Sequence, residues 1–388
     1  MNHLPTEPEV IPMSRQIRST SPHRRERQRG QILVIAVMSM IAMIGGVALV
    51  LEAGNAYAHQ REVQNSADAV ANAGATVLAQ RLGGTPKTDA DVAAAVANFA
   101  GANRLTAQAA WYTDVKGKLL TSAGTLTATT ASAARVGAGV IPPGTQGVHV
   151  GGSQAFGTGF ARVLGVTQFT ASADATAVTG ALTGGQFLPV VFPINIVDCE
   201  KNGDLGVGEA GWQISDPDPA GGHPIGQKYI VPLCKSGGGS FMILDLDGTK
   251  NNCADEVANP PALQFDAFPK DIGSDNGNNC AKQMLDEVNK LAGKIVLIPV
   301  CDGECVTNHG TNANYHIIKV TAFYLDYMSD QNGGKNTLCQ GNGTTLVPIA
   351  GNGSSSCVAG WFVRYITSGP VGSGAITGNE AIGIQLIK

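Results

Sequence analysis

The hydrophobic and polar positions divide the chain into parts with different patterns. The twenty residues from Ile32 to Leu51 carry no charged side chain. At 1.5 Å rise per residue, a helix of that length reaches roughly 30 Å, the thickness of the hydrocarbon core of a bilayer. A secretory signal has an apolar region of only ~7–15 residues before its cleavage site, so this length favours a retained transmembrane helix.

Basic residues on one side of the apolar run predict its orientation. The arginines that precede it are Arg24, Arg25, Arg27 and Arg29. Such residues stay in the cytoplasm, so we expect a single-pass membrane protein with a cytoplasmic N-terminus and an extracytoplasmic C-terminal domain. A cleaved signal and a buried core helix are the alternatives. Gly30-Gln31 resembles a type IV prepilin cleavage site, but Ile35 stands where that family has a glutamate.

The segment after the apolar run predicts a stalk helix that continues to Arg81. It contains no proline, and small or apolar residues recur at helical spacing from Val63 to Leu78. A stripe with so little bulk needs a close-packed neighbour, in this chain or in another. The expected packing residues are Ala67, Asp68, Ala71 and Gly74. A solvated linker helix is the alternative.

Residues 85–180 predict a small α+β domain. Thr88 and Asp91 have the spacing of a capping box at the start of an alanine-rich helix that ends near Asn103. The elements expected after it are a strand around Val148, a helix over Phe156–Leu164 that ends at Gly165, and a strand over Thr167–Thr179.

Residues 186–388 predict a mostly β domain with one amphipathic helix at Ala281–Leu291. The expected strands are Leu188–Val197, Tyr229–Leu233, Phe241–Leu246, Lys294–Val300, Tyr315–Tyr327 and Trp361–Ile366. The fold class is therefore α+β. It comprises a basic cytoplasmic tail (1–31), a transmembrane helix (32–51), a stalk helix (52–81), the small α+β domain and the β domain.

The cysteines all lie in the last of these parts. They are Cys199, Cys234, Cys253, Cys280, Cys301, Cys305, Cys339 and Cys357. An even number of cysteines outside the cytoplasm predicts disulfides, because only an oxidising compartment lets them persist. The sequence does not select among the possible pairings.

Charge is sparse and unevenly placed. Charged residues make up 14% of the chain, and residues 1–31 hold six arginines and three glutamates, which leaves 20 basic and 27 acidic residues for the remainder. Most of the chain would therefore repel phosphate, so nucleic acid is not an expected partner.

One loop has the spacing of a calcium site. In DCEKNGDLGVGE the oxygen ligands fall at positions 1, 3, 5 and 12, and Gly203 stands at position 6, where a calcium loop turns sharply. The candidate ligands are Asp198, Glu200, Asn202 and Glu209. Glu200 departs from the pattern, and the flanking helices of an EF-hand are missing. An acidic turn that presents Cys199 for a disulfide is the alternative.

Three further patterns suggest other chemistry. FMILDLDGTK is similar to the motif of haloacid-dehalogenase phosphotransferases, in which Asp245 would be the nucleophile and Asp247 the acid/base, but no βαβ alternation follows. A GxGxxG formed by Gly206, Gly208 and Gly211 precedes two prolines instead of a helix, which speaks against a nucleotide site. A zinc site would use Cys301, Cys305, His309 and His316, with a disulfide as the alternative for the thiols.

The N-terminal module resembles that of the TadE/TadG-like proteins of the Flp (tight adherence) pilus system. The residues that carry the resemblance are Arg29-Gly30-Gln31, the apolar run, Glu52, Gly54, Tyr57, Arg61, Gln64, Ser66-Ala67-Asp68-Ala69 and Ala73-Gly74-Ala75. This sequence departs by Glu52 in place of the usual Asp and by Val70-Ala71-Asn72 within the alanine motif.

The resemblance implies a membrane-anchored structural component or accessory factor in Flp pilus assembly. Its expected partners are the lipid bilayer and other pilus-assembly membrane proteins or pseudopilins. We expect no catalytic residue, no cofactor and no small-molecule substrate. The alternative is a tethered extracytoplasmic enzyme or a ligand-binding module.

Overall fold

The computed structural model describes most of the chain. The described residues are 24–194, 212–233, 242–249, 252–265, 268–275, 280–306, 314–330, 337–339, 356–373, 376 and 380–387. The chain forms two compact units. One holds the chain up to Ala58 together with Gly157–Phe169, and the other holds His59–Phe156 together with Thr170–Lys388.

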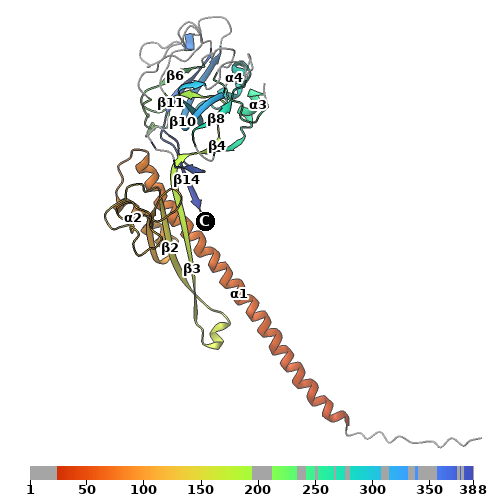
Figure 1. The fold of residues 1–388 in the computed structure, drawn as a ribbon. Coiled ribbons are helices and arrows are strands. Elements are labelled where there is room, and N and C mark those ends of the chain that lie inside the picture. The colour runs from red at the N-terminus through yellow and green to blue at the C-terminus, as the bar shows by residue number, and fades with distance from the viewer. Residues whose placement is uncertain are drawn as a thin grey trace, which may run out of the picture. The chain divides into compact units, whose positions relative to one another are not determined.

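Helix α1 runs from Arg24 to Leu82 without a break (Figure 1). It ends where Gly84 takes a left-handed backbone conformation (φ 87°) and Gly83 donates its N–H to the carbonyl of Ala79. Glycine is favoured at such a C-terminus because it has no Cβ to clash. The expected single helix through the apolar run and the stalk is confirmed.

Helix α2 (Asp89–Ala102) begins with the capping box that the sequence predicts. The backbone N–H and the hydroxyl of Thr88 both donate to Asp91 Oδ2, each at 2.7 Å. These bonds lower the pKa of Asp91, the backbone bond having the larger effect. Asp89 is buried and accepts hydrogen bonds from the Tyr112 hydroxyl and from the backbone N–H groups of Gly137 and Gly139. These bonds connect the start of α2 to Tyr112 and to the loop that contains the two glycines.

The first sheet joins three strands from residues 106–182 with three strands from residues 366–387. Its strand order is β1 (Thr106–Thr113), β2 (Gly147–Gly157), β3 (Gln168–Leu182), β14 (Ile382–Ile387) and β12 (Ile366–Ser368), with β13 (Val371–Gly372) also paired with β3. β14 pairs antiparallel with β3 and parallel with β12. Strands β12, β13 and β14 therefore complete the sheet that β1, β2 and β3 begin. The sequence pattern does not show this arrangement.

The second sheet is larger and forms the main core. Its order is β5 (Phe192–Pro193), β9 (Ile295–Val306), β10 (Asn314–Asp330), β11 (Ser356–Phe362) and β6 (Tyr229–Pro232), with β8 (Lys270–Gly273) paired with β10. A short ladder joins β4 (Gly184–Gln186) to β7 (Ala262–Gln264). The other elements of this region are α3 (Cys253–Ala258), α4 (Cys280–Asn289) and η2 (Thr337–Cys339). Phe362 is fully buried, and its ring contacts those of Trp212, Phe192 and Phe323.

Most expected elements are present, and four differ. In its described part the strand expected over Leu188–Val197 is only β5, and the strand expected over Trp361–Ile366 is β11, which begins at Ser356 and ends at Phe362. The helix expected over Phe156–Leu164 is only the short 3-10 turn η1 (Ala161–Leu164), because β2 extends to Gly157 and pairs with β3. The described part of the segment expected to be a strand at Phe241–Leu246 makes only isolated bridges, at Ile243 and Leu244. At Phe156–Leu164 the pairing of β2 with β3 overrides the local helical pattern.

Candidate functional site

No other part of the described chain packs over the apolar segment of α1, residues 32–51. Between Ile32 and Leu51 the large hydrophobic side chains are 50–72% exposed. A core helix of a soluble protein would bury such side chains. By length and composition this is the one helix among the described residues that could cross a membrane. The segment could therefore serve as a membrane anchor.

Glu52 follows this apolar segment directly and is held by a turn far away in the sequence. Its carboxylate accepts hydrogen bonds from the backbone N–H of Gly159, at 3.1 and 3.2 Å, and of Phe160, at 2.9 Å. Both donors lie in the turn between β2 and β3. The sequence identified Glu52 as the acidic residue after the anchor but gave no sign of its partners, because backbone N–H groups carry no residue signature.

The stripe of small residues on the stalk is covered by the chain itself. Ala67 and Ala71 are fully buried, and a Cβ added to Gly74 would lie 3.1 Å from a methyl of Val148 and 3.2 Å from a methyl of Val96. Helix α1 therefore packs closely between α2 and β2. Asp68 is half-buried and accepts a hydrogen bond from Gln64, one turn earlier on α1.

Because the stripe packs within the chain, bulky substitutions in it would test the stability of the fold before they tested contact with another protein. The close neighbours that the sequence predicts for the stripe lie in this chain. Residues 63–79 are therefore not a solvated linker helix. A large side chain at Ala67, Ala71 or Gly74 would disturb the folded core before it could disturb another protein. Contact of this stripe with a partner's helix is therefore no longer the simplest explanation of its small residues.

The comparisons with known proteins identify the module that contains these features. Residues 30–77 match the family model described as putative Flp pilus-assembly TadE/G-like. No curated protein and no solved structure matches the chain. The TadE/G-like module therefore comprises the apolar segment, Glu52 and most of the buried stripe, and the resemblance noted in the sequence is confirmed.

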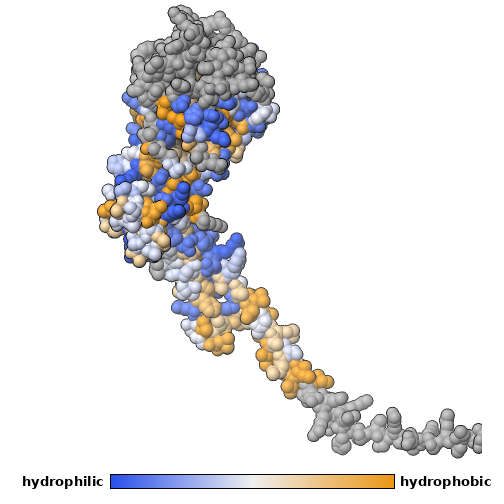
Figure 2. Space-filling view, viewed as in Figure 1, coloured by the Kyte–Doolittle hydropathy of each residue, from blue (hydrophilic) through white to orange (hydrophobic). Residues whose placement is uncertain are grey.

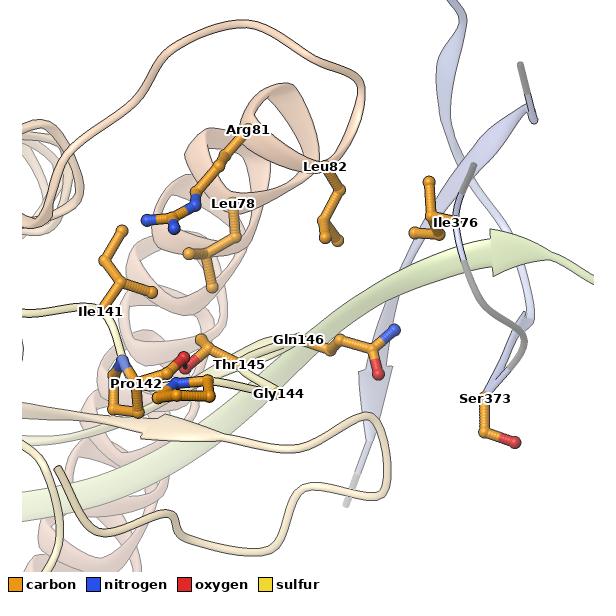
Figure 3. A pocket seen from close by; sticks show the side chains of 11 residues that line it. Leu78, Arg81, Leu82, Ile141, Pro142, Gly144, Thr145, Gln146, Ser373 and Ile376 are labelled. Atoms are coloured by element: carbon orange, nitrogen blue, oxygen red, sulfur yellow. Dashed lines mark hydrogen bonds between the residues drawn. The ribbon is translucent and has the colours of Figure 1, made fainter. Parts of the chain in front are cut away.

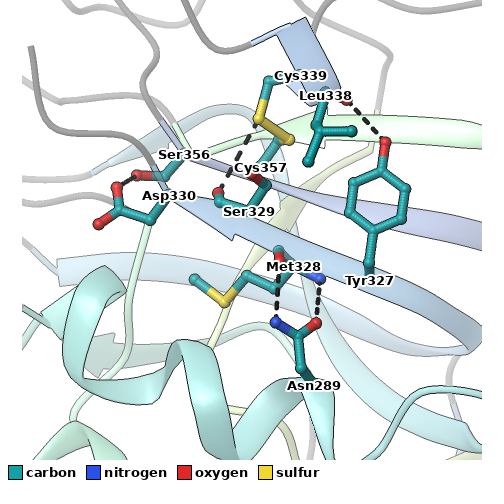
Figure 4. Close-up of a disulfide and its surroundings, with 9 residues drawn as sticks. All are labelled: Asn289, Tyr327, Met328, Ser329, Asp330, Leu338, Cys339, Ser356 and Cys357. Atoms are coloured by element: carbon teal, nitrogen blue, oxygen red, sulfur yellow. Dashed lines mark hydrogen bonds between the residues drawn. A yellow bond between two sulfur atoms is a disulfide. The ribbon is translucent and has the colours of Figure 1, made fainter. Parts of the chain in front are cut away.

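Outside the TadE/G-like module, disulfides link elements of the C-terminal region. Cys253 is bonded to Cys280 and Cys339 to Cys357. The first joins α3 to α4, and the second joins η2 to the start of β11 (Figure 4). Around the second, the side chain of Asn289 makes two hydrogen bonds to the backbone of Met328. No cysteine among the described residues is a free thiol.

The structure brings together few of the other predicted site residues. The calcium loop (Asp198, Glu200, Asn202, Glu209) and the glycines of the GxGxxG lie outside the described residues, as do Cys199, Cys234 and His309. The zinc hypothesis is wrong for Cys301, which is disulfide-bonded. His316 Nδ1 lies 2.7 Å from a carboxylate oxygen of Asp271.

Asp245 and Asp247 form a cluster with a third carboxylate, that of Glu256. One oxygen of each lies within 4.8 Å of the others. Glu256 is 2% exposed; its Oε1 accepts from the N–H groups of Leu246 and Asp247, while its Oε2 is buried without a hydrogen-bond partner among the described residues. Three such oxygens could hold a hard divalent cation.

The surroundings of this cluster do not fit the phosphotransferase motif. That chemistry requires a parallel sheet and a helix after the Asp-containing turn. Here Ile243 and Leu244 make antiparallel bridges, and α3 has six residues. The sequence could have indicated Glu256, because it lies at position 12 of a run that begins at Asp245, a spacing found in calcium loops.

The cluster predicts a pH-dependent stability. The pKa of Glu256 is raised to about 7: burial has the largest effect, the charges of Asp247 and Asp245 act in the same direction, and the hydrogen bonds from Leu246 and Asp247 oppose them. Glu256 therefore stabilises the fold fully below its ordinary pKa of 4.5, and this stabilisation is lost as the pH rises through about 7. We expect Glu256→Gln to stabilise the protein by about 1–2 kcal/mol at pH 8 and by much less at pH 5.

Thermal unfolding of the detergent-solubilised chain, with a chelator present, would measure this difference. Glu287→Gln is the matched control, because Glu287 lies on α4 and pairs with Lys290 at the surface. An equal effect of Glu256→Gln on stability at both pH values would contradict the raised pKa of Glu256.

A cavity lies at the C-terminal end of α1 (Figure 3). Its volume is about 450 Å³, and its described lining comes from Leu78, Arg81 and Leu82 of α1, from the loop Ile141–Gln146, and from Ser373 and Ile376. Arg81 is the one charged side chain in that described lining. The lining residues therefore provide no pair of groups for acid–base catalysis.

Proposed function

We propose that this protein is a membrane-anchored structural component or accessory factor in the assembly of a Flp pilus. The match of residues 30–77 to the TadE/G-like family carries the proposal. The exposed apolar segment of α1 supports anchoring in the bilayer, and the folded layers that follow provide surfaces for other membrane proteins of the pilus machinery or for pseudopilins.

The N-terminus lies in the cytoplasm and the folded part outside it. The arginines before Gln31 support this orientation, since basic flanks remain on the cytoplasmic side. The disulfides Cys253–Cys280 and Cys339–Cys357 also support it, because such bonds persist in an oxidising compartment. The role is structural, and the protein is not an enzyme. No described arrangement favours the tethered enzyme over the scaffold.

Deletion of the gene is expected to abolish surface pili, and the full chain supplied in trans is expected to restore them. Pili would be counted by electron microscopy and adherence measured on a solid surface. The pair Asp245→Asn and Asp247→Asn is the control, because a structural protein does not need these carboxylates for chemistry. Normal piliation of the deletion strain would refute the proposal. Loss of pili in the aspartate pair, with normal protein levels, would direct attention to the carboxylate cluster.

A further inference from the structure

The turn between β2 and β3 exposes more apolar surface than a loop in water would. Val163 and Leu164 on η1 are each 86% exposed, and Phe160 and Val166 of the turn and Phe169 at the start of β3 are 38–46% exposed. Figure 2 shows apolar side chains gathered at this turn and along the membrane segment of α1. A contiguous apolar patch of this kind marks a surface that contacts a partner or a membrane.

The hydrogen bonds of Glu52 fix the level of this turn relative to the anchor. Glu52 is the first residue after the apolar run that ends at Leu51, so a spanning helix places it where the hydrocarbon core meets the headgroups. Gly159 and Phe160 lie within 3.2 Å of its carboxylate. The four residues of η1 follow immediately, and a 3-10 helix of that length spans about 8 Å. The apolar side chains of the turn therefore lie at the level of the bilayer surface.

The chemistry around the patch is that of a membrane interface. Arg162 is exposed on the same turn, where a guanidinium could pair with lipid phosphate. Tyr57 is 64% exposed and lies five residues beyond Glu52, about 7–8 Å further along the helix axis, at headgroup level. The two backbone N–H groups that bind Glu52 satisfy a carboxylate that would otherwise be poorly solvated beside hydrocarbon.

We propose that the β2–β3 turn, together with the start of β3 (residues 159–169), inserts into the outer leaflet of the membrane as a second contact beside the anchor helix. This inference rests on the proposed anchoring of α1. A lipid surface is favoured over a second protein because the turn is hydrogen-bonded to Glu52, the first residue after the apolar run, so its patch continues the lipid-facing surface of the anchor. The second contact would limit how far the unit that contains the anchor and the turn can tilt in the bilayer.

The test places an environment-sensitive fluorophore on single introduced cysteines of the full chain in phosphatidylcholine–phosphatidylglycerol vesicles. Leu164→Cys reports on the turn and Ile41→Cys on the anchor. Ile225→Cys is the matched control, because it is apolar and 58% exposed on a loop of the other unit. The described cysteines are disulfide-bonded, and unmodified protein measures any background labelling. Lipids that carry a nitroxide quench only probes that reach the bilayer, and iodide quenches only probes in water.

We expect nitroxide lipids to quench the probes at 164 and 41 at least threefold more strongly than the probe at 225. Quenching at 41 but not at 164 would overturn the insertion and leave the anchor in place. Protection of the probe at 164 from iodide without nitroxide quenching would mean that protein covers the turn, and would also overturn it. Quenching at neither position would refute the anchoring and the insertion together.

Discussion

Gly74→Leu is expected to lower the free energy of unfolding by about 2–3 kcal/mol. A Cβ at this position already lies 3.1 Å from Val148 and 3.2 Å from Val96, and the rest of a leucine side chain has no space between α1, α2 and β2. Overpacking of a core costs about 1–3 kcal/mol or more, and the gain in helix propensity of about 1 kcal/mol offsets only part of a large cost. Thermal unfolding of the solubilised chain and hydrogen exchange over residues 63–79 would measure the loss.

Gly101→Leu is the matched control for this prediction. Gly101 lies on α2, and a Cβ added there meets no atom within 4 Å, so leucine should leave stability unchanged or slightly raised. Gly74→Ala should be close to neutral, because its tight Cβ contacts oppose the gain in helix propensity. Equal unfolding temperatures for Gly74→Leu and the unmodified protein would show that α1 does not pack between Val96 and Val148.

Replacing both Cys253 and Cys280 by alanine is expected to lower the free energy of unfolding by about 3.5 kcal/mol. The bond closes a loop of 27 residues, and a cross-link of that span removes this much conformational entropy from the unfolded chain in the loop-closure model. Both cysteines are fully buried, so alanine also leaves a small cavity. Denaturant unfolding under non-reducing conditions would measure the change.

The Cys339–Cys357 pair gives a comparison within the same chain. Its loop is shorter, at 18 residues, so its double alanine variant should lose about 3 kcal/mol. Full reduction should unfold the C-terminal region and leave the helical signal of α1. Thiol alkylation of protein taken directly from cells tests whether these cysteines are disulfide-bonded. Labelling of these four cysteines before reduction would contradict both the disulfides and the extracytoplasmic location.

The sequence predicted the elements whose signals are local. The apolar run, the capping box of Thr88 and Asp91, the amphipathic helix now seen as α4, and the long strands β9 and β10 all follow from periodicity and turn residues. The family resemblance was equally local, because it depends on an ordered set of residues within one helix. The return of β14 to β3 and the pairing of the cysteines could not be predicted, because they depend on contacts between residues far apart in the sequence.

The sequence by itself determined that the chain has an anchor-like helix, a TadE/G-like module and a cysteine-rich, mostly β region with one amphipathic helix. Only the tertiary structure decided what covers the small-residue stripe, since Gly74 indicates a close approach but does not name Val96 and Val148 as the neighbours. It alone also placed the turn after β2 against Glu52 and Glu256 beside Asp245 and Asp247. The physical reason is the same in each case. Periodicity records which face of an element is apolar or small, whereas the identity of the group that meets that face depends on how distant segments pack together.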